Sequence, residues 1–337
     1  MADITESFPT HLIETIRKNN DNFRVLKRNP YEHIDSGYSF PYPLINEQDV
    51  QCQIVGDEIS VVFLDTETTG LTSEDVIIEL SMVKAGYSPS ARCFTCVYGV
   101  YDEFEDPKKP IPEKAKQITG ITDEDVKDKK IQEADVLDML KDNPIIVAHN
   151  ARFDYGMFNR RFKHIDSIKK LRWFCSFNEI KWRALFPTFY SQKLEFIMAE
   201  LGYFYSSHRA IYDCLALLCL FQVVKPCMDV CLKNINEVRY RLIFNNVDNI
   251  ADYGKMTDKG FLYNGKNATS PYVKYVRIFP TEDEAQCCRR ELLDSFREND
   301  GLYFVPEKVI RYDQSLRDSY FENRCVVQLY DATNKYS

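Results

Sequence analysis

The most informative segment for the fold is Ile59-Ser-Val-Val-Phe-Leu-Asp-Thr-Glu67. Its first six residues are mostly apolar and β-branched and do not alternate with polar ones, which is typical of a central strand buried on both faces. Asp65 and Glu67 follow, and positions i and i+2 of a strand point to the same face. The stretch therefore predicts a buried strand that ends in two carboxylates directed at one point.

The flanking sequence predicts a mixed sheet covered by helices. Four further strands are expected, at 76–87, 92–104, 144–149 and 173–176. Helices are expected after the third strand at 111–119, after the fourth at 151–162, and after the fifth at 193–201 and 208–224. Strands that first form a meander and then alternate with helices favour an α/β arrangement.

A chain of 337 residues predicts roughly two domains. Residues 1–58 are polar and turn-rich, which indicates a peripheral N-terminal segment, and residues 59–232 carry the strand and helix pattern. Beyond residue 233 the alternation fades, and a strand at 272–279 with a helix at 282–296 predicts a small C-terminal α+β unit over 233–337.

The composition excludes several classes of protein. Hydrophobic residues make up 45% and charged residues 28%, with only 12 Gly and 14 Pro, which excludes a disordered or collagen-like chain. The longest apolar run, Ile211–Val224, is too short for the ~20 residues of a membrane span, and the N-terminus has no signal-peptide pattern. Eleven scattered cysteines favour reduced thiols and a cytoplasmic location.

Two adjacent carboxylates such as Asp65 and Glu67 repel each other unless a cation lies between them. Their hard oxygen atoms suit Mg²⁺ or Mn²⁺. The alternative is that Asp65 caps a turn and Glu67 is solvated.

Two more acidic positions lie near predicted helix starts. Asp154 lies in the first turn after the fourth strand, where an acidic residue can simply stabilise the helix N-terminus. On an ideal helix the five-residue spacing places His208 about 140° from Asp213. The two residues serve one centre only if His208 lies at or before the helix start, with Ser206 or Ser207 as the N-cap. Structural and catalytic roles both stay open at this point.

Four motifs occur in the order Phe63-Leu-Asp-Thr-Glu-Thr-Thr-Gly-Leu71, Ile118-Thr-Gly-Ile-Thr122, Ala148-His-Asn-Ala-Arg-Phe-Asp154 and His208-Arg-Ala-Ile-Tyr-Asp213. Together they resemble the DEDDh, or DnaQ-like, 3′–5′ exonuclease family, which includes the proofreading epsilon subunit of bacterial DNA polymerase and stand-alone relatives with an appended C-terminal domain. The resemblance implies a ribonuclease-H-like fold with a five-stranded mixed sheet flanked by helices. It also implies two divalent metal ions, Mg²⁺ or Mn²⁺.

By this resemblance Asp65 bridges both metals, while Glu67 and Asp213 complete the first metal site. Asp154 would hold the second metal, and His208 would be the general base, a role that suits an imidazole because its pKa lies near neutral pH. The residues implied to contact the substrate are Thr68, Leu71, Asn150 and Phe153.

The formal net charge of −8 disfavours non-specific coating of nucleic acid. Residues 152–183 nevertheless carry nine basic side chains against three acidic ones, interleaved with Phe153, Phe158, Trp173 and Phe174. This pattern favours a groove that follows a phosphodiester backbone. The alternative is a solvated helix face.

These observations predict a metal-dependent exonuclease that releases nucleoside monophosphates from the 3′ end of single-stranded nucleic acid, with DNA favoured. Three alternatives stay open: an exoribonuclease of the same mechanism, a catalytically silent nucleic-acid-binding module, and a regulatory factor with a protein partner at the C-terminal unit.

Overall fold

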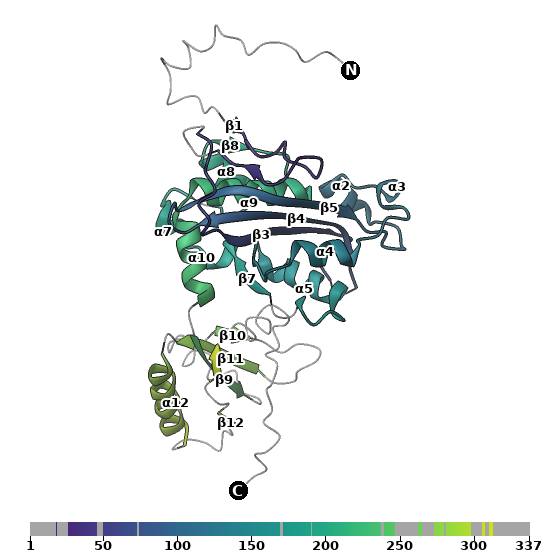
Figure 1. The fold of residues 1–337 in the computed structure, drawn as a ribbon. Coiled ribbons are helices and arrows are strands. Elements are labelled where there is room, and N and C mark those ends of the chain that lie inside the picture. Colours follow the sequence, from purple (N-terminus) through teal and green to yellow (C-terminus); the bar gives the residue numbers. More distant parts are fainter. Residues whose placement is uncertain are drawn as a thin grey trace. The chain divides into compact units, whose positions relative to one another are not determined.

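The computed structural model is shown in Figure 1. It describes residue 18 and residues 26–45, 50–72, 74–168, 171–189, 191–236, 239–246, 262–264, 273–279, 281–297, 305–306 and 310–312. Two compact units are distinguished: Met1–Lys141 with Ile180–Lys225, and Asp142–Glu179 with Pro226–Ser337. The predicted division at 58/59 and 232/233 stays a prediction.

The first unit contains four antiparallel strands in the order β2-β5-β4-β3. Their bounds are Tyr42–Pro43 for β2, Ile59–Thr68 for β3, Ile77–Ser88 for β4 and Cys93–Phe104 for β5. The three long strands agree with the predicted meander. The short β2 comes from the N-terminal segment, which was not expected to contribute a strand.

Strand β3 changes character along its length. Residues 61–64 are buried on both faces, as the continuous apolar run predicts. From Asp65 onward the burial alternates: Asp65 and Glu67 are partly exposed, while Thr66 and Thr68 are buried. The strand therefore directs both carboxylates to one partly open face, as its period of two requires.

Helix α9 (Ala210–Val223) lies along β3 and β4 (Figure 1), and α8 (Leu194–Glu200) packs beside it. Because α9 is apolar around its whole circumference, almost all of it is buried. Near its end the buried side chain of Gln222 accepts the Phe94 N–H at 2.8 Å and donates to the Phe94 carbonyl at 3.0 Å. These bonds fasten the C-terminal end of α9 to β5.

In the described part of the chain, no single helix has the length and apolar character to cross a membrane. One bent pair, Ala210–Val223 with Pro226–Ile235, meets the criterion of length and composition when its two helices are taken together.

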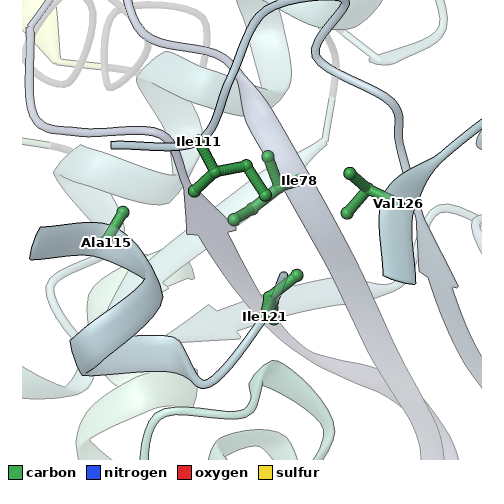
Figure 2. Packing of buried hydrophobic residues seen from close by; sticks show 5 residues of the cluster. All are labelled: Ile78, Ile111, Ala115, Ile121 and Val126. Atoms are coloured by element: carbon green, nitrogen blue, oxygen red, sulfur yellow. The ribbon is translucent and has the colours of Figure 1, made fainter. Parts of the chain in front are cut away.

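Three short helices follow β5: α2 (Glu113–Thr119), α3 (Asp123–Val126) and α4 (Glu133–Met139). Gly120 ends α2 at φ 71°, a left-handed conformation that glycine adopts without steric cost. A small core joins this region to β4 (Figure 2); its members are Ile78, Ile111, Ala115, Ile121 and Val126. The motif Ile118–Thr122 is thus held against the sheet through Ile121.

The second unit contains the parallel pair β6 (Ile145–Ala148) and β7 (Arg172–Cys175). Its helices here are α5 (Ala151–Phe162), which packs on both strands, α6 (Ser176–Glu179) and α10 (Pro226–Asn236). Parallel and antiparallel pairs therefore both occur, and the predicted mixed sheet flanked by helices is confirmed.

The C-terminal residues form a second, antiparallel sheet in the order β10-β11-β9-β12, and β13 also pairs with β9. The strands are β9 (Arg239–Asn246), β10 (Leu262–Asn264), β11 (Val273–Phe279), β12 (Val305–Pro306) and β13 (Ile310–Tyr312). Helix α12 (Glu282–Arg297) packs on β9 and β11. The expected strand, helix and α+β character are confirmed here.

Candidate active site

Three carboxylates meet at the end of β3. Asp65 and Glu67 come from β3, and Asp213 comes from the first turn of α9. One carboxylate oxygen of each lies within 4.8 Å of the others, and all three residues are partly exposed. Because like charges this close repel each other, a divalent cation would stabilise the cluster, and its all-oxygen donor set fits Mg²⁺ or Mn²⁺.

The carboxylate of Asp213 is oriented by two donors. The Tyr205 hydroxyl donates to Oδ1 at 2.8 Å, and the main-chain N–H of His208 donates to Oδ2 at 3.0 Å. Burial raises the pKa of Asp213 to about 6, and these two hydrogen bonds oppose the rise. Each oxygen keeps a further lone pair with which it can bind a cation.

His208 lies two residues before the first residue of α9. This placement confirms the condition under which His208 and Asp213 can serve one centre. The N-cap is Arg209, however, and not Ser206 or Ser207. His208 has φ 67°, its side chain is 53% exposed, and its Nε2 lies 3.7 Å from Oε2 of Glu195 on α8. The imidazole is therefore open to solvent on a loop whose backbone conformation is held by its surroundings.

Glu79, on β4, holds the N-terminus of α9. Its fully buried carboxylate accepts hydrogen bonds at Oε1 from Nε and Nη2 of Arg209, at 2.9 and 2.7 Å. Its Oε2 accepts the main-chain N–H of Ala210 at 3.0 Å. Burial raises the pKa of Glu79, and the Arg209 hydrogen bonds oppose the rise. A side chain of the sheet thus satisfies the first N–H of α9 and fixes the turn that carries Asp213.

The strand register explains why Arg209 is needed. Glu67 lies directly opposite Glu79, and Asp65 lies directly opposite Ser81. Residues in opposite positions share one face of the sheet, and like charges placed in this way are destabilising. The Arg209 guanidinium supplies the compensating positive charge beside Glu79.

We expect Glu79→Ala to lower the free energy of unfolding by about 3 kcal/mol, because it removes one partner of a buried ion pair. Urea unfolding followed by circular dichroism measures this change. The matched control is Glu103→Ala on β5, where Glu103 is exposed and the expected change is within about 0.5 kcal/mol. Equal stability of the two variants would contradict a role for Glu79 in holding α9.

The turn after β3 is closed by Asp75. Its carboxylate accepts the Thr69 hydroxyl at 2.8 Å and the Thr72 N–H at 2.8 Å. A Cβ on Gly70 would lie 2.6 Å from Asp75 Oδ2, so a larger residue at that position would displace the carboxylate that closes the turn. The turn leaves Leu71 83% exposed, which suits its predicted contact with the substrate.

Thr68, also a predicted substrate contact, is buried. Its hydroxyl donates to the Gly70 carbonyl at 2.7 Å.

The other predicted site residues belong to the second unit. Asn150 is exposed and adopts a left-handed conformation at φ 69° just before α5, and its carbonyl accepts the Phe153 N–H at 2.8 Å. Asp154 lies in the first turn of α5 and is buried. The metal-binding role of Asp154 and the substrate contacts of Asn150 and Phe153 stay predictions.

The basic stretch 152–183 is only partly suited to the stacking of bases. Phe158, Trp173 and Phe174 are fully buried in the core of the second unit, so they cannot stack on a nucleotide. Phe153 is partly exposed. The exposed basic side chains among the described residues include Arg152, Arg160, Lys163, Lys181 and Arg183.

Sequence reasoning missed four residues that shape the site, namely Glu79, Glu195, Tyr205 and Arg209. One of them had a visible signal, since Glu79 is an acidic residue between the apolar residues Ile78 and Leu80 of a predicted strand. Such a residue is almost never fully buried without a partner. The partner itself, Arg209, lies 130 residues further along the chain.

Residues 62–221 match the family model described as exonuclease (RNase_T). Two curated relatives are DNA polymerase III of the PolC type. The protein from Bacillus subtilis is 31% identical over 169 residues, which cover 48% of this chain and 11% of that protein. The protein from Oceanobacillus iheyensis is 32% identical over 222 residues, which cover 63% of this chain and 14% of that protein. The chain therefore spans only a small part of the length of these relatives.

Solved exonuclease structures are more distantly similar. Escherichia coli exonuclease I in complex with an oligonucleotide is 15% identical with a TM-score of 0.47, covering 72% of this chain and 71% of that one. Exonuclease X in complex with 5′ overhanging duplex DNA is 24% identical with a TM-score of 0.36, covering 50% and 91%.

Proposed function

We propose that this chain is a metal-dependent 3′–5′ exonuclease, because residues 62–221 match the exonuclease (RNase_T) family model. It removes nucleoside monophosphates from the 3′ end of single-stranded nucleic acid by a two-metal mechanism. DNA is the favoured substrate because the curated relatives are named as DNA polymerases.

The observation that carries the proposal is the carboxylate cluster of Asp65, Glu67 and Asp213, with His208 two residues before the helix that carries Asp213. Asp65 and Glu67 are fixed by the strand, and Asp213 is fixed by its two hydrogen bonds. These three residues would hold a divalent cation, and Asp154 is proposed as the ligand of a second one. Bound Mg²⁺ or Mn²⁺ would stabilise the negative charge that develops on the attacking and leaving oxygens of the phosphodiester.

The remaining chemistry is a proton transfer. His208 takes the proton of the attacking water, and its solvent-exposed position leaves room for a water molecule and a phosphate group. The Glu195 carboxylate lies 3.7 Å from Nε2 of His208. Leu71, at the tip of the turn after β3, packs beside the terminal base, and an apolar contact of this kind tolerates any sequence.

The proposal is tested with one panel of oligonucleotides, DNA and RNA, single- and double-stranded, labelled at either end. With Mg²⁺ or Mn²⁺ we expect mononucleotide release from 3′-labelled single strands and progressive shortening of 5′-labelled ones. An excess of chelator should remove the activity, because the carboxylate cluster then lacks the cation. Degradation is followed on denaturing gels.

Each other outcome identifies an alternative. Faster degradation of RNA would indicate an exoribonuclease, and binding without degradation would indicate a silent binding module. Activity that persists in chelator would contradict the metal-dependent mechanism.

Two further predictions accompany the proposal. A cytoplasmic location is supported by the ten cysteines of the described residues, none of which forms a disulfide. A protein partner bound by residues 233–337 stays a prediction, and a pull-down with and without these residues would test it.

A further inference from the structure

We propose that residues 26–34, here called the N-terminal strap, are a positioning element of the active site that holds the 202–208 loop carrying His208. The strap lies outside the residues that match the exonuclease family. The inference rests on the proposed function, because it takes His208 to be the general base.

The strap is joined to the loop through its backbone. Strand β1 (Lys27–Arg28) pairs in parallel with β8 (Tyr203–Phe204). The Lys27 N–H donates to the Gly202 carbonyl at 2.8 Å, and the Asn29 N–H donates to the Phe204 carbonyl at 2.9 Å. Two main-chain bonds therefore fix the first half of the loop.

Glu32 fixes the second half. Its Oε1 accepts the main-chain N–H of Ser206 at 3.0 Å, and its Oε2 accepts a hydrogen bond from Nη1 of Arg28 at 2.9 Å. The Arg28 guanidinium also lies 4.7 Å from the centre of the Phe204 ring. Burial raises the pKa of Glu32, but the hydrogen bonds from Ser206 and Arg28 outweigh it, so this pKa lies below its usual value. Glu32 is therefore ionised at neutral pH and forms charge-assisted bonds.

The strap is itself anchored in the core of the first unit. Tyr31 and Ile34 are buried, and the Tyr31 hydroxyl donates to the Ile45 carbonyl at 2.7 Å. The buried side chain of Asn29 accepts the Tyr31 N–H at 3.1 Å. The strap thus gives the loop a rigid support.

Ser206, which Glu32 holds, lies next to Tyr205 and two residues before His208. The strap therefore acts on the loop close to the catalytic groups. Tyr205 donates to Asp213 Oδ1, and His208 donates its main-chain N–H to Asp213 Oδ2. His208 adopts φ 67°, a left-handed conformation that is strained for a non-glycine residue and persists only where the surroundings enforce it. The contacts at Phe204 and Ser206 supply part of that enforcement.

The test compares Glu32→Ala, Glu32→Gln and Arg28→Met with the control Glu124→Ala, an exposed glutamate on α3. Glu32→Ala is expected to lower kcat on a 3′-labelled oligonucleotide by about 10- to 100-fold, since a misplacement of about 1 Å has effects of that size. KM should change little, because Leu71 lies elsewhere. Glu32→Gln keeps an oxygen that can accept the Ser206 N–H and should recover much of the loss.

Two readouts separate positioning from general stability. Amide hydrogen exchange at Ser206 and His208 should become faster in Glu32→Ala while exchange in β3 and β4 stays slow. Arg28→Met changes an exposed side chain, so its fold should stay intact. Its loss of kcat should be smaller than that of Glu32→Ala. This variant tests the proposal even if Glu32→Ala unfolds.

Asp213→Asn in the same assay separates this proposal from the proposed function. If Asp213→Asn is inactive while folded Glu32→Ala and Arg28→Met keep the wild-type kcat and exchange rates, the role of the strap is wrong and the nuclease assignment stands. If Asp213→Asn remains active, the proposed function is wrong. Faster exchange at Ser206 in Glu32→Ala would then still support the structural hold of the strap on the loop.

Discussion

Asp65→Ala should abolish nucleotide release from single-stranded oligonucleotides and weaken Mn²⁺ binding. Asp65 is one of three carboxylates whose oxygens lie within 4.8 Å of one another, so its loss removes a direct cation ligand. Removing an outer-shell partner of a metal ligand lowers activity by about 10- to 100-fold. The fall expected for Asp65→Ala is larger, because Asp65 is a proposed direct ligand. Activity is measured on labelled oligonucleotides, and Mn²⁺ affinity is measured by calorimetry.

The matched control is Asp135→Ala, which removes the same charge from an exposed position on α4. It should keep wild-type activity and Mn²⁺ affinity. Asp65 is partly exposed, and its strand β3 stays paired with β4 through main-chain hydrogen bonds. The fold of both variants should therefore be intact by circular dichroism. Degradation by Asp65→Ala as fast as by the control would show that the site has been assigned wrongly.

The sequence predicts this part of the site well because one periodicity governs it. In a strand the side chains alternate, so the spacing of Asp65 and Glu67 alone places them on one face. The sequence predicts that His208 and Asp213 can serve one centre only if His208 lies at or before the start of the helix. The structure meets this condition.

The supports of the site could not be predicted, because they depend on pairings between distant segments. Glu79 faces Glu67 only through the register of β3 and β4, and it meets Arg209 only because α9 packs on these strands. Glu32 reaches Ser206 across 174 residues of sequence. No local pattern encodes such contacts, although a carboxylate within an apolar strand does indicate that a partner exists.

For the basic stretch 152–183, the sequence suggests a surface that the structure only partly provides. Its interleaved aromatic residues suggested a stacking surface, but Phe158 and Trp173 are core residues of α5 and β7. Aromatic residues can either fill a core or stack on bases. Composition alone cannot separate the two uses, because it does not show which face of a helix or strand is buried.

His208→Ala is expected to slow hydrolysis by about 10²- to 10⁴-fold, the usual contribution of general base catalysis, while Mn²⁺ binding is largely retained. Mn²⁺ binding should be retained because Asp213 accepts its hydrogen bond from the main-chain N–H of His208, which alanine also provides. Single-turnover degradation measures the chemical step, and calorimetry measures Mn²⁺ affinity. His208→Asn is the matched variant, because asparagine adopts the left-handed conformation at φ 67° more readily than alanine.

The two variants together separate the imidazole from the backbone of the loop. If the proton transfer alone is lost, both variants should be slowed to the same degree, and added imidazole should restore part of the rate at pH values where it is neutral. If the loop geometry is what matters, His208→Asn should be far more active than His208→Ala, and imidazole should restore neither. Loss of Mn²⁺ binding in both would instead place His208 among the groups that hold Asp213, and the general base would have to be sought elsewhere.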